Sequence, residues 1–212
     1  MTYNSKIHHR RTIRLKNYDY AQAGLYFITI CCQNRAHLFG EIINGEMKLN
    51  DHGKIAYEEW KQTEKIRRNC FIHEFIIMPN HIHGIIEITC NKGKEELIGK
   101  FHSPTQTIGS FIRGFKIATI KRIKEKILEE NLNSSNSSTG ELQFAPTAPT
   151  ATIGSIDPTE YIKKLNFKIW QRNYYEHIIR DENSNYRISE YIKNNPKKWE
   201  QDMNQLKMNK IN

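Results

Sequence analysis

The pattern of apolar and polar positions predicts β-strands in both halves of the chain. Runs rich in β-branched and aromatic residues indicate strands at residues 24–32, 71–78, 81–89 and, as one or two short strands, within 167–179. The first run is almost continuously apolar, which is typical of a central strand buried on both faces. Asn44-Gly45 lies between alternating residues and predicts a β-hairpin over 39–49.

Helical periodicity predicts three helices: from Asn50 or Asp51 to about Arg67, from Ile108 to about Leu128, and from about Asn185 to Asn194. The long middle helix carries one broad apolar stripe, interrupted by Thr119, and basic residues occupy much of its remaining surface. Pro196 ends the last helix, because the residue before a proline avoids helical geometry.

The main elements follow the order strand, helix, strand, strand, helix, strand, helix. This order favours an α+β domain, in which helices pack on a ferredoxin-like antiparallel sheet. We predict a single domain over residues 21–200, with a basic arm at 1–20 and a polar tail at 201–212. Residues 129–160, rich in Asn, Ser, Thr and Ala-Pro repeats, predict a flexible insert because they cannot bury a core.

The excess of positive charge favours a polyanionic partner. The formal net charge is +9 and the pI is about 9.3, which favours nucleic acid over a membrane. The basic arm at 1–20 is equally compatible with a solvated tail and with contacts to a DNA backbone. No apolar run reaches the length of a membrane span and no signal-peptide core is present, so we expect a cytoplasmic protein without a membrane partner.

The predicted strand at 81–89 opens with His81-Ile82-His83. Successive side chains alternate between the faces of a strand, so the two imidazoles project from the same face. Two imidazoles held side by side can chelate a divalent metal. The simpler alternative is a polar strand edge that happens to carry two histidines.

The same stretch resembles a known family. Residues 78–83, Met-Pro-Asn-His-Ile-His, are similar to the signature of REP-associated tyrosine transposases, relatives of the single-tyrosine HUH transposases of small insertion sequences. The stretches 170–177 and 191–196 resemble the same family, as does the basic segment that begins at Arg10. The resemblance extends from about Arg10 to Trp199, outside the insert, and implies an HUH nuclease type of fold.

The resemblance also implies an activity and a site. A metal-dependent single-stranded DNA endonuclease and strand transferase would cleave through a covalent 5′-phosphotyrosine and then rejoin the DNA. The family places its nucleophile five residues before the proline, where this chain has Tyr191, although the residues alone favour a packing tyrosine. His81, His83 and Asn195 would hold Mg²⁺ or Mn²⁺, and some relatives carry Gln at the position of Asn195.

The expected partner is single-stranded or hairpin DNA, bound by a monomer or a homodimer. We expect basic side chains to contact this DNA, because guanidinium and ammonium groups bind phosphate oxygens. The predicted DNA-binding residues are Arg10, Arg11, Arg14, Arg113, Lys116 and Arg172.

Two other functions remain open at the level of sequence. A nucleic-acid-binding module would use exposed aromatic and basic side chains of the sheet, and would need neither the histidine pair nor a nucleophile. A zinc hydrolase built on His81 and His83 is the weaker alternative, because a third and a fourth ligand at matched spacing are missing from the sequence.

Overall fold

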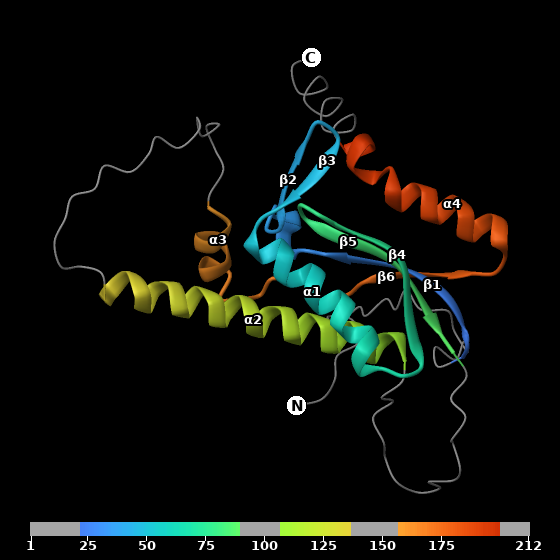
Figure 1. The fold of residues 1–212 in the computed structure, drawn as a ribbon, viewed down its shortest axis with the longest axis horizontal. Helices are drawn as coiled ribbons and strands as arrows, with labels where there is room; N and C mark the ends of the chain where they lie inside the picture. Colours follow the sequence, from blue (N-terminus) through green and yellow to red (C-terminus); the bar gives the residue numbers. More distant parts are fainter. Residues whose placement is uncertain (1–21, 90–106, 137–156, 200–212) are drawn as a thin grey trace, which may run out of the picture.

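A four-stranded antiparallel sheet forms the centre of the fold (Figure 1). The computed structural model describes residues 22–89, 107–136 and 157–199. The strands, in their order across the sheet, are β4 (Cys70–Met78), β5 (His81–Ile88), β1 (Gly24–Cys31) and β6 (Tyr175–Ile179). The prediction that residues 24–32 form a central strand is confirmed, because β1 pairs with both β5 and β6.

Helices cover both faces of this sheet. Helices α1 (Asp51–Ile66) and α2 (Ile108–Asn136) lie on one face, and α4 (Glu182–Lys193) lies on the other (Figure 1). Ignoring the hairpin described below, the order β1-α1-β4-β5-α2-β6 and the spatial arrangement of the strands are those of a ferredoxin-like unit. The predicted α+β class, an antiparallel sheet with helices packed on it, is therefore confirmed.

The alternation of β1 explains why both faces are covered. Tyr26, Ile28 and Ile30 are fully buried in the larger core, which α1 and α2 cover. Leu25 and Phe27 point to the opposite side and pack in a smaller cluster beneath α4. Each face of the strand therefore has its own apolar partner, as period-two alternation requires.

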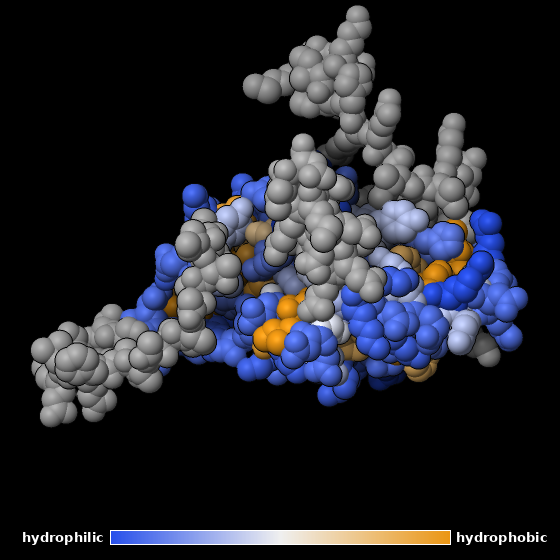
Figure 2. Space-filling model, turned by 90° about the horizontal axis from the view of Figure 1, so that it is seen from above, coloured by the Kyte–Doolittle hydropathy of each residue, from blue (hydrophilic) through white to orange (hydrophobic). Residues whose placement is uncertain are grey.

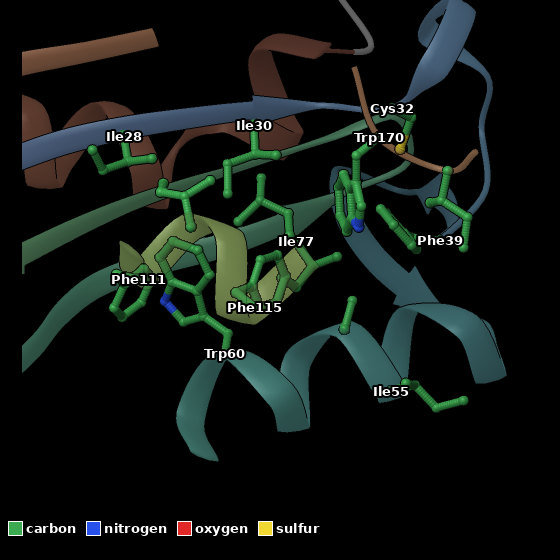
Figure 3. Close-up of a cluster of buried hydrophobic side chains, with 14 of the residues drawn as sticks. Ile28, Ile30, Cys32, Phe39, Ile55, Trp60, Ile77, Phe111, Phe115 and Trp170 are labelled. Atoms are coloured by element: carbon green, nitrogen blue, oxygen red, sulfur yellow. The ribbon is translucent and has the colours of Figure 1, made fainter. Parts of the chain in front are cut away.

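Trp60 of α1 fills the centre of the larger core (Figure 3). Its ring meets Phe111 and Phe115 of α2 edge to face, with centroid distances of 5.1 and 5.0 Å. The indole also lies directly over Gly84 of β5, where a Cβ atom would come within 2.6 Å of Cζ2 of Trp60. Glycine at this position therefore allows α1 to approach the sheet closely.

The predicted hairpin is present as a separate two-stranded sheet, formed by β2 (Gly40–Ile43) and β3 (Glu46–Leu49). Asn44 and Gly45 both have positive φ, 54° and 73°, as a type I′ turn requires. The next helix, α1, is capped by Asn50, whose side-chain oxygen accepts a hydrogen bond from the backbone N–H of Gly53 at 2.9 Å. Of the two residues predicted to start the helix, Asn50 and Asp51, Asn50 is therefore the N-cap.

The predicted insert at 129–160 is too wide at both ends. Helix α2 continues to Asn136, and a short helix, α3 (Pro158–Lys164), begins before the predicted insert ends. Asp157 caps α3 by accepting from the N–H of Glu160 at 3.0 Å, and Ile162 is fully buried. A proline in the first turn and a capping aspartate are signals for the start of a helix. The prediction missed them because the polar composition of the region favoured a flexible insert. Residues 137–156 lie outside the described part.

Helix α4 also starts earlier than predicted, at Glu182, because Asp181 accepts from the N–H of Ser184 at 2.8 Å. It ends at Lys193, and residues 195–199 form a further helical turn after a break at Asn194. Pro196 lies within this turn, so the prediction that Pro196 ends the helix is wrong. No helix in the described ranges combines the length and the apolar character that crossing a membrane would need. Seen from above, the described surface is mainly hydrophilic, with apolar side chains in small separate patches (Figure 2).

Candidate active site

The histidine pair opens β5 on the face that α4 covers. His81 and His83 project from this face, and both side chains are buried, with 6% of each residue exposed. Their ring centroids are 4.4 Å apart and the rings are steeply inclined to one another. The predicted orientation of the two imidazoles is therefore observed, and they form a compact pair of nitrogen donors.

Each imidazole is held through its Nδ1 atom. Nδ1 of His81 lies 2.7 Å from Oδ1 of Asn80, and Nδ1 of His83 lies 2.8 Å from Oγ1 of Thr29. A carboxamide oxygen can only accept, so Nδ1 of His81 carries the proton and its Nε2 has a free lone pair. The Thr29 hydroxyl permits the same tautomer in His83, which leaves Nε2 of that ring as an acceptor.

Burial also determines the charge of the pair. It lowers the pKa of His81 to about 4 and that of His83 to about 3. The Arg35 guanidinium acts in the same direction on both rings, as do the His37 imidazole on His81 and the His81 imidazole on His83. Both rings are consequently neutral near pH 7. A neutral imidazole is the form that coordinates a metal ion.

Tyr191 reaches this pair from α4. Its hydroxyl lies 3.3 Å from Nε2 of His83, and the ring centroids of the two residues are 5.2 Å apart. Tyr191 keeps 40% of its surface exposed, whereas its neighbour Ile192 is buried against the sheet. Ile192 therefore anchors the helix, while the phenol stands beside the imidazoles and remains open to solvent.

The turn after α4 completes the surroundings. The ammonium of Lys198 lies 5.7 Å from the centre of the Tyr191 ring, and the Trp199 ring lies 5.6 Å from that of His81. Asn195, one helical turn after Tyr191, is buried with 6% of its surface exposed. In the described part of the chain, no three His, Cys, Asp or Glu side chains cluster as a metal site. Asn195 as the third metal ligand stays a prediction.

The predicted DNA contacts are not gathered at this site. Arg10, Arg11 and Arg14 lie outside the described residues. Arg113 is exposed on α2, which covers the opposite face of the sheet from α4, and Arg172 is exposed in the segment before β6. Their roles stay predictions.

Lys116, also on α2, has a different environment from the one expected. Its ammonium donates to the carbonyl oxygens of Gln171 at 2.7 Å and Asn173 at 3.3 Å. Lys116 thus ties α2 to the segment before β6, and its role as a phosphate contact stays a prediction.

Sequence reasoning did not identify the residues that orient the imidazoles. Asn80 belongs to the recognised motif, yet its hydrogen bond to His81 could not be inferred from the motif alone. Thr29 lies opposite His83 in the pairing of β1 with β5, and no local signal gives this register.

Comparison with known proteins adds a relative and two partial likenesses. No protein-family model matches the chain. Two solved structures share part of the fold: a REP-associated tyrosine transposase bound to a REP hairpin, and a candidate transposase from Deinococcus radiodurans. The first has a TM-score of 0.47 at 15% identity over 88% of this chain and 74% of that one. The second has a TM-score of 0.40 at 12% identity over 86% and 97%.

At these identities and TM-scores, neither likeness bears on the function of this chain. The sequence is 41% identical over 215 residues to an uncharacterized protein of Haemophilus influenzae, covering 94% of this chain and 95% of that protein. The chain therefore belongs to the same protein family as this Haemophilus influenzae protein.

Proposed function

We propose that the chain is a metal-dependent single-stranded DNA endonuclease and strand transferase of the HUH type, similar to REP-associated tyrosine transposases. The observation that carries the proposal is the 3.3 Å approach of the Tyr191 hydroxyl to Nε2 of His83, with His81 beside it. A nucleophile and two neutral nitrogen donors thus converge on one point, although they come from segments far apart in the sequence.

The residues present fit a divalent metal. Both imidazoles are oriented by Nδ1 partners and neutral, and the buried amide of Asn195 offers an oxygen donor one turn after Tyr191. Mg²⁺ or Mn²⁺ held by His81, His83 and Asn195 would supply positive charge at the scissile phosphate and the leaving oxygen.

Cleavage in this scheme starts at Tyr191. Its oxygen attacks phosphorus and loses its proton, a new O–P bond forms, and the P–O3′ bond breaks. The departing 3′-oxygen takes up a proton, which leaves a free 3′-hydroxyl and a 5′-phosphotyrosine. Attack by a 3′-hydroxyl on the phosphotyrosine reverses these events and rejoins a strand. The exposure of the Tyr191 ring leaves room for the strand to reach it.

The test is formation of a covalent adduct with a labelled single-stranded hairpin in the presence of Mn²⁺, seen on a denaturing gel. Tyr191→Phe removes one oxygen from a half-exposed side chain, so we expect a folded protein that binds DNA and forms no adduct. Peptide mapping of the wild-type adduct should place the nucleotide on Tyr191.

The neighbouring tyrosines provide matched controls. Tyr175 and Tyr186 are also exposed, and their Phe variants should form the adduct at the wild-type rate. An adduct that persists in Tyr191→Phe, or in wild type with excess EDTA, contradicts the proposal. DNA binding without an adduct under every metal condition would instead favour a binding module without catalysis.

A further inference from the structure

A hollow of about 460 Å³ lies on the α2 side of the molecule, apart from the histidine pair. It is bounded by α2, by the segment that joins α3 to β6, and by the 3-10 turn Gln33–Arg35 that follows β1. Sites for small ligands typically measure about 300–1,000 Å³. We call this feature the basic hollow, and its size suits one nucleotide.

The lining of the basic hollow combines an apolar floor with a cationic rim. Ile120, Leu165 and Phe167 provide apolar surface, while Lys168 and Arg172 are exposed at the edge. Among the described residues that line it, every ionisable one is a lysine or an arginine. Lys124 contributes a further ammonium, 5.4 Å from the centre of the Phe167 ring. The hollow therefore favours an anionic ligand with a flat apolar part.

A second, larger hollow lacks the purely basic lining of the basic hollow. It measures about 1060 Å³, lies beside the β2–β3 hairpin, α1 and α3, and is lined by the carboxylates of Glu41, Asp51, Glu130 and Asp157 as well as by lysines. A phosphate would be repelled by those carboxylates. Of the two, the basic hollow is the one whose charge complements a nucleic-acid strand.

The backbone around the basic hollow adopts strained conformations. Phe167 has a φ of 58° and Asn166 a φ of 49°. Asn34 and Arg35, which follow the lining residue Gln33 in the 3-10 turn, have φ values of 56° and 54°. A bulky aromatic residue rarely adopts the left-handed region, and such conformations persist where the surrounding structure imposes them. Here the conformation places the Phe167 ring in the wall of the hollow, where a planar ligand can stack on it.

Hydrogen bonds connect the basic hollow to the strand end that carries His81. The backbone N–H of Gln171 donates to the carbonyl of Cys31 at 2.9 Å, and Cys31 is paired with His81 across the sheet. The side-chain amide of Asn80 donates to the carbonyl of Arg35 at 3.1 Å. The walls of the hollow are thus fixed to the same end of the sheet as the histidine pair.

We propose that the basic hollow binds one unpaired nucleotide of the DNA strand, with its base stacked on Phe167 and its flanking phosphates held by Lys168 and Arg172. The side-chain amides of Gln33 and Gln171 line the same hollow and can donate and accept at the edge of the base. Aromatic stacking is the usual way in which single-stranded nucleic acid is held, because every base has a flat face. This inference rests on the proposed action on single-stranded DNA.

The experiment measures binding of two labelled strands of equal length, oligothymidylate and an abasic strand with the same number of phosphates, by fluorescence anisotropy. All proteins carry Tyr191→Phe, so that cleavage does not enter the measurement. Phe167→Leu keeps an apolar side chain and removes the ring. We expect it to bind oligothymidylate about 5- to 100-fold more weakly than the parent protein and to bind the abasic strand equally well.

The rim is tested by removing its two exposed cations. Lys168→Ala/Arg172→Ala should weaken binding of both strands and flatten the salt dependence by roughly 1.4 in slope, since each phosphate contact on a single strand contributes about 0.7. The matched control, Lys61→Ala/Lys65→Ala, removes the same charge from exposed positions on α1 and should have a much smaller effect. An equal loss in the control overturns the proposal, as does unchanged oligothymidylate binding by a folded Phe167→Leu.

A cross-linking measurement needs no substitution in the hollow. A strand containing 5-iodouracil, irradiated on the protein, should label the peptide that contains Phe167 and Trp170. Labels found only on other peptides overturn the proposal. If wild type forms no covalent adduct, the proposed endonuclease activity fails, while the binding and cross-linking results still decide whether the basic hollow takes a nucleotide.

Discussion

At the scale of single residues, the candidate site depends on two side chains that perform no chemistry themselves. Thr29 and Asn80 form hydrogen bonds with the Nδ1 atoms of His83 and His81, which leaves both Nε2 atoms available to coordinate a metal ion. We predict that Thr29→Val, which keeps the β-branched shape and removes the hydroxyl, lowers Mn²⁺ affinity by about 10- to 100-fold. The measurement is Mn²⁺ binding followed by electron paramagnetic resonance, without DNA.

Thr29→Ser is the matched control, because it retains the hydroxyl and should bind Mn²⁺ like wild type. Circular dichroism would verify that both variants are folded. If the valine variant binds Mn²⁺ as tightly as the serine variant, Thr29 has no part in orienting His83.

At the scale of elements, the helices on the two faces of the sheet dock through very different contacts. Helix α1 docks through Trp60, whose indole lies against Gly84, whereas α4 docks through the small cluster around Ile192. We predict that Gly84→Ala lowers the free energy of unfolding by about 1–3 kcal/mol, because its methyl group would overlap the indole. Urea unfolding followed by tryptophan fluorescence would measure the change.

A second substitution tests whether the overlap is the cause. Trp60→Phe removes the part of the ring that meets the new methyl group. The double variant Gly84→Ala/Trp60→Phe should therefore be more stable than the sum of the two single effects predicts. Strict additivity would show that Gly84 is needed for another reason, such as the backbone geometry of β5.

At the scale of the whole molecule, buried histidines make stability depend on pH. Burial lowers the pKa of four histidines in the described part of the chain, His37, His52, His81 and His83. In the unfolded chain their pKa is about 6.5. Below this value the unfolded state binds protons that the folded state does not, so stability falls as the pH falls from about 6.5 towards 4. Urea unfolding of the metal-free protein at pH 7.5 and pH 5 should show this loss.

His52 isolates one of these contributions, because it lies on α1 and away from the candidate site. In His52→Gln the difference in unfolding free energy between the two pH values should be smaller than in wild type. A difference in His52→Gln as large as that of wild type would contradict the assignment to burial.

The sequence by itself determined the features that depend on backbone geometry within one segment. Period-two alternation puts His81 and His83 on one face of a strand whatever lies beside them. Asn44-Gly45 fixes its turn through left-handed φ, and Asn50 caps α1 through a hydrogen bond three residues away. Asp181 caps α4 in the same way, through a hydrogen bond from the N–H of Ser184. Each feature arises from neighbouring residues, so a local pattern is enough to reveal it.

Only the tertiary structure decided which distant segments meet. The register of β1 against β5 sets Thr29 beside His83, and the docking of α4 brings the Tyr191 hydroxyl to the same ring. The carbonyl partners of Lys116 likewise belong to a segment far along the chain. No sequence period encodes these contacts, because they follow from packing two faces of one sheet against separate helices, and that packing is settled by the shape and burial of many side chains together.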